Sequence, residues 1–144
     1  MKVKDILRTK GSKVITASIN DSILGAVRVM VENSVGSVLL LDADGKPFGI
    51  FTERDVLRQV AENPEKLDRM QIKDVVYCDP YVCVPDDDLD SVMELMTEKR
   101  FRHVPVMEEG KLIGIISIGD IVKALHHSTQ FELRHMRDYI MGKI

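Results

Sequence analysis

The chain has 144 residues, of which 44% are hydrophobic and 30% are charged, and this balance excludes a disordered or fibrous protein. A domain of this length buries roughly two thirds of the surface of its unfolded chain, and it is too short for two unrelated enzyme domains. The formal net charge of −3 gives no general attraction for nucleic acid or anionic lipid, so a phosphate-binding site would have to be local.

The first half of the chain predicts a short strand, a helix, a hairpin and a final helix. Residues 14–17 ("VITA") are rich in β-branched side chains, and residues 20–22 (Asn, Asp, Ser) offer capping oxygens before apolar residues recur at helical spacing over 23–31. The segments "GSVLLLD" and "PFGIFT" flank residues 44–45 (Asp-Gly), which predicts an antiparallel hairpin whose first strand is buried on both faces. The last helix of this half is expected to begin near Thr52.

The second half predicts the same order of elements after a polar connector at residues 61–71. The segment "YVCV" is the expected strand, and the apolar residues over 89–96 indicate a helix. The hairpin "HVPVMEEGKLIGII" and the closing helix "GDIVKAL" follow. A further helical segment trails this half, with Leu133, Met136 and Ile140 on one apolar stripe.

The two halves are copies of one unit. "GIFTERD" at residues 49–55 returns as "GIISIGD" at 114–120, with glycine, hydroxyl and carboxylate 65 positions apart in each case. "VKDI" at 3–6 likewise returns as "IKDV" at 72–75. The stretch that follows is "LRTKGSK" in the first copy but only "VYCD" in the second, which predicts a difference in loop length.

Other site types receive little support from the sequence. No apolar run approaches the roughly 20 residues of a membrane span, and charges interrupt the apolar residues at the start of the chain, so we expect a cytoplasmic protein. Cys78 and Cys83 are too few and wrongly spaced for a zinc site or a disulfide framework, which favours reduced structural thiols. The histidines at 126, 127 and 135 are expected on the surface, because no carboxylate cluster completes a metal set.

Each seven-residue motif has two interpretations. A hydroxyl followed three residues later by a carboxylate at a helix start is close to a capping box, in which both side chains satisfy free backbone N–H groups. The same helix terminus attracts phosphate, and the carboxylate can accept two hydrogen bonds from the vicinal hydroxyls of a ribose. One motif alone does not decide between the cap, made by Thr52 with Asp55 or Ser117 with Asp120, and the nucleoside site.

The duplicated unit resembles a known family. Two copies of "G-apolar-apolar-[Thr or Ser]-x-x-Asp" at the start of the last helix are similar to tandem CBS domains, named after cystathionine β-synthase, and the resemblance runs from Val3 to about Leu125. It implies a stand-alone CBS pair of the bacterial and archaeal type. The implied fold is an α/β (α+β) sandwich of two β-α-β-β-α repeats with pseudo-twofold symmetry. The expected organisation is a first repeat at 1–60, a connector at 61–71, a second repeat at 72–126 and a C-terminal helical tail at 127–144.

The resemblance also implies that each ligand cleft is shared between the repeats. The ribose and phosphate lie against one copy's last helix, and the base lies against the other copy's first strand and the residue before its hairpin. The expected ligand-binding residues are Ile15, Thr16, Val35, Thr52, Arg54, Asp55, Tyr81, Phe101, Arg102, His103, Pro105, Ser117 and Asp120. This arrangement pairs Ser117 and Asp120 with Ile15 and Val35, and pairs Thr52 and Asp55 with Tyr81 and Phe101.

Several of these residues have an ordinary structural alternative. Tyr81 and Phe101 could stack on a purine, or they could simply fill the core. Arg102 and His103 match a basic pair that faces phosphates in nucleotide-binding members, whereas the first copy has glycine and serine at those positions. Arg54 could add charge to the first site or remain a solvated surface residue.

The sequence and the resemblance together predict a regulatory sensor and not an enzyme. The expected ligand is AMP, ADP or ATP, which acts as a regulatory ligand and not as a cofactor; NAD and S-adenosylmethionine are alternatives, and so is a scaffold module that binds no ligand. No nucleophile with its base, metal set or matched acid pair is apparent. The apolar stripes predict a homodimer. An unidentified protein target is expected as a further partner, whereas nucleic acid and membrane are not.

Overall fold

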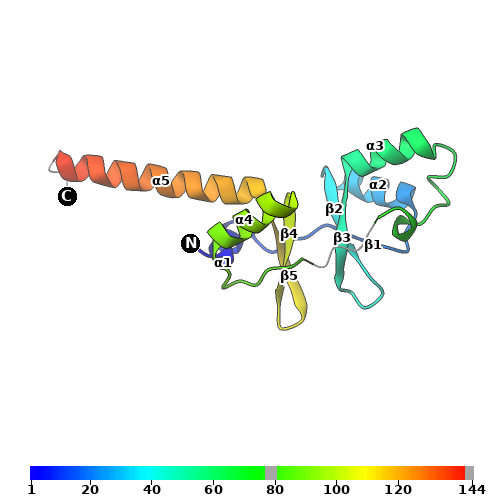
Figure 1. Ribbon diagram of the computed structural model, residues 1–144, viewed down its shortest axis with the longest axis horizontal. Helices are drawn as coiled ribbons and strands as arrows, with labels where there is room; N and C mark the ends of the chain where they lie inside the picture. The colour runs from blue at the N-terminus through cyan, green and yellow to red at the C-terminus, as the bar shows by residue number, and fades with distance from the viewer. Residues whose placement is uncertain (77–80, 142–144) are drawn as a thin grey trace.

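The computed structural model describes residues 1–76 and 81–141, and it shows two units side by side with one long helix projecting from the second unit (Figure 1). The helix α1 (Val3–Lys10) comes first. The first unit contains β1 (Thr16–Ser18), α2 (Ile23–Glu32), β2 (Ser37–Leu41), β3 (Pro47–Thr52) and α3 (Glu53–Glu62). A 3-10 helix (Ile72–Asp74) precedes the second unit, which contains α4 (Leu89–Lys99), β4 (His103–Glu108), β5 (Lys111–Ser117) and α5 (Ile118–Ile140).

The first unit forms the three-stranded sheet that its sequence predicts. β1 pairs with β2 in parallel, and β2 pairs with β3 in antiparallel orientation around the turn that carries Gly45 at φ 75°. The three central residues of β2, Val38, Leu39 and Leu40, are buried, which confirms a strand covered on both faces. Ser22 is the N-cap of α2, and its side chain accepts a hydrogen bond from Gly25 N at 2.9 Å.

The second unit has a two-stranded sheet, because the strand predicted at "YVCV" is reduced to one bridge. Cys83 N donates to Pro105 O at 2.9 Å, and Met107 N donates to Cys83 O at 2.8 Å. The next rung on one side would need an N–H from Pro105, and the next rung on the other side would need one from Pro85. Proline has no N–H to donate, so this parallel ladder ends after a single residue.

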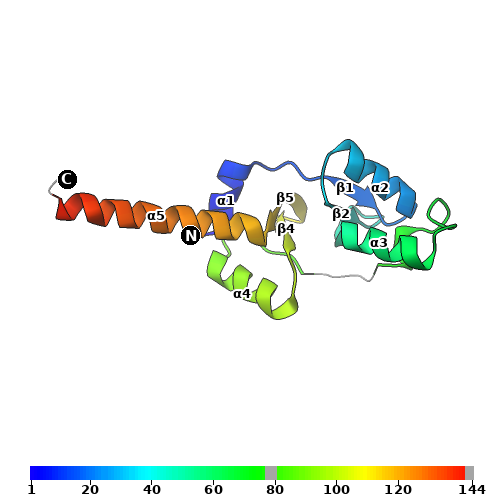
Figure 2. The same cartoon turned by 90° about the horizontal axis from the view of Figure 1, so that it is seen from above.

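The two units exchange their leading segments, because each segment packs in the core of the other unit. Val3 and Ile6 of α1 are buried in the core of the second unit, whereas Ile72 of the 3-10 helix is buried in the core of the first. Figure 2 shows α1 beside β5 and the start of α5, away from α2 and α3. Two isolated antiparallel bridges show the same exchange. Lys2, before α1, pairs with Asp88 of the second unit, and Gln71, before the 3-10 helix, pairs with Ser22 of the first.

The connector at residues 61–71 also packs against the first unit and accepts hydrogen bonds from the start of α2. The carbonyl oxygens of Met70 and Leu67 accept hydrogen bonds from Ile23 N and Leu24 N at 3.1 and 2.9 Å, so they satisfy backbone groups at the start of α2. The side chains of Leu67 and Met70 also pack partly against the first core.

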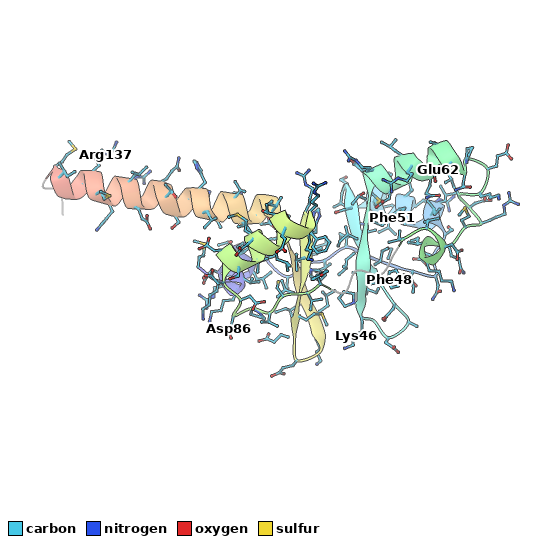
Figure 3. All side chains as sticks on the ribbon, viewed as in Figure 1. Lys46, Phe48, Phe51, Glu62, Asp86 and Arg137 are labelled. Carbon is cyan, nitrogen blue, oxygen red and sulfur yellow. The ribbon has the colours of Figure 1, made fainter. Side chains whose placement is uncertain are left out.

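The closing helix of the second unit and the predicted helical tail form one continuous helix, α5, of 23 residues. Its tail projects into solvent, where Leu133, Met136 and Ile140 are 61%, 59% and 79% exposed. Figure 3 shows Arg137 near the far end of α5, clear of the other elements. Among the described residues, no helix combines the length and the hydropathy that a membrane span requires.

Candidate functional site

A cavity of about 710 Å³ lies between the two units. The first unit lines it with the start of α3 and with parts of β2 and β3, and the second unit lines it with the segment around β4. Its lining residues are Gly36, Ser37, Gly49, Ile50, Thr52, Glu53, Arg54, Val76, Tyr81, Arg100, Phe101, Arg102, His103 and Pro105. A hollow of this volume is large enough for a nucleotide.

The first motif places a capped helix start on the wall of this cavity. Thr52 is the N-cap of α3, and Asp55 Oδ2 accepts hydrogen bonds from Thr52 N at 2.9 Å and from the Thr52 hydroxyl at 3.0 Å. Asp55 N donates in return to Thr52 Oγ1 at 3.4 Å. Asp55 Oδ1 lies 3.7 Å from Arg58 NH1. The geometry of the capping box is therefore present, and Oδ1 is the Asp55 oxygen with room for a further donor.

Two aromatic rings of the second unit form the opposite wall. The ring centroids of Tyr81 and Phe101 are 5.0 Å apart at an interplanar angle of 50°. Tyr81 is 39% exposed, so it does not act as a core residue, whereas Phe101 packs partly against the second core. The pair is fixed on one side and open to the cavity on the other, which suits contact with a planar base.

The cavity carries an excess of positive charge. Arg54, Arg100 and Arg102 all line it, and Glu53 is its one acidic lining residue. Within the described part of the chain, no carboxylate oxygen lies within 4.0 Å of these three guanidinium groups. Unpaired arginines gathered around one hollow favour an anionic ligand such as phosphate.

Arg100 is a lining residue that the sequence analysis missed. It ends α4 in the left-handed conformation, with φ 62° and ψ 35°, a region that residues other than glycine seldom adopt. The turn directs the chain from α4 toward the cavity. The basic run "KRFR" before β4 was the available signal, but only the φ angle of this residue shows where the run bends.

In the second motif, the side chain of Lys10 binds the carboxylate of Asp120. Ser117 N donates to Asp120 Oδ2 at 2.9 Å, and Asp120 N donates to Ser117 Oγ at 3.1 Å. The ammonium group of Lys10 donates to the same Asp120 Oδ2 at 2.6 Å. Burial alone would raise the pKa of Asp120, but the hydrogen bonds from Lys10 and Ser117 outweigh it and hold that pKa below its ordinary range.

His103 connects the two motifs, since it lines the cavity and pairs with Ser117 across the β4–β5 hairpin. Its partial burial lowers its pKa below the ordinary value of 6.5, and the positive charges of Lys10 and Arg102 lower it further. Asp120 acts in the opposite direction, with an effect smaller than that of Lys10 and larger than that of Arg102. His103 is therefore neutral near pH 7, and the arginines carry the charge of the cavity.

The other expected ligand residues lie in the first unit. Thr16 pairs with Leu39 in the sheet, and Ile15 and Val35 pack partly against the first core. Val35 also lines a second, apolar groove of about 540 Å³ between α2 and α3, where Val31 and Leu57 are exposed.

Cysteine and metal chemistry find no support among the described residues. Cys83 is buried and unpaired, and burial raises the pKa of its thiol to about 12, so it stays protonated. Cys78 lies outside the described residues. Within residues 1–76 and 81–141, no three His, Cys, Asp or Glu side chains are grouped to hold a metal ion.

Comparisons with known proteins agree with this architecture. The family model of the CBS domain matches residues 3–62 and again residues 72–127. A CBS-domain protein of Agrobacterium tumefaciens, ATU1752, is 42% identical in sequence; the match covers 85% of this chain and 92% of that chain, with a TM-score of 0.76.

Two other similar structures contain ligands. The CBS domain protein PAE2072 of Pyrobaculum aerophilum, complexed with AMP, is 25% identical, with coverages of 83% and 89% and a TM-score of 0.71. The CBS domain pair of protein MJ0100, in complex with 5-methylthioadenosine and S-adenosyl-L-methionine, is 26% identical, with coverages of 89% and 98% and a TM-score of 0.74. The two matched segments and the two-unit fold show that this chain belongs to the CBS-domain family, as a tandem pair.

Proposed function

We propose that this protein is a regulatory module that binds an adenosyl ligand, with AMP, ADP or ATP foremost, in the cavity between its two repeats. The observation that carries this proposal is the composition of the cavity wall. The wall combines the capped start of α3 at Thr52, two aromatic rings and three arginines that make no ion pair within the described residues. These groups match the ribose, base and phosphates of a nucleotide.

The similar proteins support the same class of ligand. PAE2072 holds AMP, and MJ0100 holds two adenosyl compounds. NAD and S-adenosylmethionine share the adenosyl group, so they are alternative ligands for the same cavity. The three arginines favour a ligand with phosphates over the cationic S-adenosylmethionine.

The cavity spans both units, which suggests how a ligand acts. A molecule that contacts α3 on one side and the Tyr81–Phe101 pair on the other joins the two units, and so it biases their relative position. We propose that a protein partner reads this change, and that the module regulates without catalysing a reaction.

A scaffold that binds no ligand is the second candidate, because both motifs also serve as helix caps. Asp55 and Asp120 each accept a hydrogen bond from the backbone N–H of the residue that precedes the helix. A cap needs no ligand, so the two functions must be separated by experiment.

The test is a melting-temperature screen of AMP, ADP, ATP, NAD, S-adenosylmethionine and GTP. A ligand that binds only the folded state stabilises it by about 2.7 kcal/mol at roughly 100 times its dissociation constant, which raises the melting temperature by several degrees. We expect a shift with at least one adenosyl compound and little with GTP. If no compound raises the melting temperature of the wild type, the result favours the scaffold that binds no ligand.

The matched variants are Asp55→Asn and Asp5→Asn. Asp5 occupies the same capping-box position in α1, where its carboxylate accepts from Lys2 N at 2.8 Å. Neither Lys2 nor Asp5 lines the cavity, whereas Thr52, the partner of Asp55 in its capping box, does. Both variants weaken one helix cap, by about 1 kcal/mol or less. We expect only Asp55→Asn to lose the ligand-dependent shift; equal ligand responses in both variants would assign Asp55 to the cap alone.

A further inference from the structure

Lys10 makes the shortest ion pair among the described residues, and it makes it with the carboxylate of the second motif. Its Nζ lies 2.6 Å from Asp120 Oδ2 and 2.9 Å from the carbonyl oxygen of Ile115. Two of the three donors of the ammonium group are therefore used. The side chains of Lys10 and Asp120 are 32% and 26% exposed, so the pair is partly shielded from water.

Helix α1 holds Lys10 in this position. Val3 and Ile6 are buried in the second core, and Leu7 lies directly over Gly114 in β5. A Cβ atom on Gly114 would come within 2.7 Å of Leu7 Cδ2, so a side chain at this position would force Leu7 to shift. The glycine of the second motif thus brings the last turn of α1, and with it Lys10, next to Asp120.

Within the described residues, no cation from another element pairs with the carboxylate of the first motif as Lys10 does with that of the second. The stretch that corresponds to residues 7–13 in the second copy is "VYCD", and it contains no lysine or arginine. Within the described residues, Asp55 pairs with Arg58, which belongs to the same helix and whose NH1 lies 3.7 Å from Asp55 Oδ1. The two copies share a motif but differ in the cation on its carboxylate.

We propose that Lys10 keeps the second motif closed to a ribose, so that one chain binds one adenosyl ligand, in the cavity beside the first motif. This inference rests on the proposed function. It differs from the expectation that both Asp55 and Asp120 hold a ribose. A ribose that uses both oxygens of Asp120 would have to displace the charge-assisted hydrogen bond of 2.6 Å that Lys10 donates to Oδ2, and charge-assisted bonds are the stronger kind. At Asp55, the corresponding oxygen accepts from the neutral Thr52 hydroxyl at 3.0 Å.

The experiment is a calorimetric titration of the full chain with AMP, which counts the bound molecules. We expect one AMP per chain in the wild type. Lys10→Met removes the ammonium group and keeps an unbranched side chain, so we expect a second binding event that is at least about tenfold tighter than any second event in the wild type. Lys13→Met is the matched control, because Lys13 makes no ion pair within the described residues; it should bind one AMP.

Two further variants identify the site of the second event. Adding Asp120→Asn to Lys10→Met should abolish the second event and leave the first. Adding Asp55→Asn instead should abolish the first and leave the second. Lys10→Gln, which keeps a polar head group without the charge, repeats the test if Lys10→Met lowers the yield of folded protein.

The outcomes separate this inference from the proposed function. Two molecules of AMP per wild-type chain, or a single event in both Lys10 variants, would overturn the role of Lys10 and leave the proposed function in place. Absence of AMP binding in the wild type and in every variant would refute both. A second event that persists in the variant carrying Asp120→Asn would also overturn the inference, since the ligand would then use other residues.

Discussion

Replacing Arg102 by glutamine should weaken the binding of ADP while leaving the binding of adenosine unchanged. Arg102 is exposed, lines the cavity and makes no ion pair within the described residues, so its removal leaves no buried charge behind. The folded state should therefore lose little stability. The variant tests the contact with phosphate and not the integrity of the fold.

The size of the effect follows from the strength of one charge-assisted contact. Hydrogen bonds to charged groups contribute about 1.5–3 kcal/mol, and the low end applies because solvent reaches this side chain. About 1.5 kcal/mol corresponds to roughly a tenfold increase in the dissociation constant for ADP. Adding Arg54→Gln should raise it again by a similar factor, provided that the two arginines hold different phosphate oxygens.

The assay is isothermal titration with ADP and with adenosine at two salt concentrations. Arg28→Gln is the control, because Arg28 is an exposed arginine of α2 that lies outside the cavity lining and the substitution changes the net charge equally. A similar loss of ADP affinity in both variants would show that only the overall charge matters. An equal loss of adenosine affinity in Arg102→Gln would show that the substitution disturbs the cavity itself, and either result refutes the assignment.

Three other predictions concern the fold, the pH dependence and the assembly. Gly114→Ala should lower the free energy of unfolding by about 1 kcal/mol in urea, because the new methyl group overlaps Leu7, whereas Gly119→Ala, with 3.6 Å of clearance, should not; equal losses would contradict this. The lowered pKa of His103 makes the unfolded state take up a proton first as the pH falls below 6.5, so the wild type should lose more stability between pH 7.5 and 5.5 than His103→Gln does. Light scattering should give a dimer mass at micromolar concentration, and removing residues 129–144 should weaken the dimer without abolishing it; a monomer mass for the full chain would contradict the prediction.

The elements that the sequence predicts correctly have local causes. The hairpin of the first unit follows from an Asp-Gly turn between apolar strands, and the start of α2 follows from a capping serine. The duplication of the unit can also be recognised from the printed sequence alone. The two prolines that shorten the strand at Cys83 were equally visible, but their effect depends on which groups face each other across the bridge.

The features that the sequence could not predict join distant parts of the chain. The apolar spacing of Val3, Ile6 and Leu7 fits a helix, but spacing does not show which of two similar sheets the helix covers. Lys10 and Asp120 are 110 positions apart in the sequence, so no local pattern predicts their contact. The wall of the cavity also joins the two repeats, through Thr52 and Tyr81, but this pairing was expected from the family resemblance and not from any local pattern.

The projecting part of α5 gives the proposed signalling a mechanical route. Its first turn is fixed to the second unit, because Ile121 is buried and Ser117 with Asp120 caps the helix start. A helix of 23 residues is about 34 Å long, so a rotation of the second unit by about 5° moves the far end by about 3 Å. A ligand that touches both units acts on this rotation, whereas a ligand on the second unit alone does not. The exposed stripe of Leu133, Met136 and Ile140 lies where this displacement is largest, so we propose it as the surface from which a partner detects an occupied cavity.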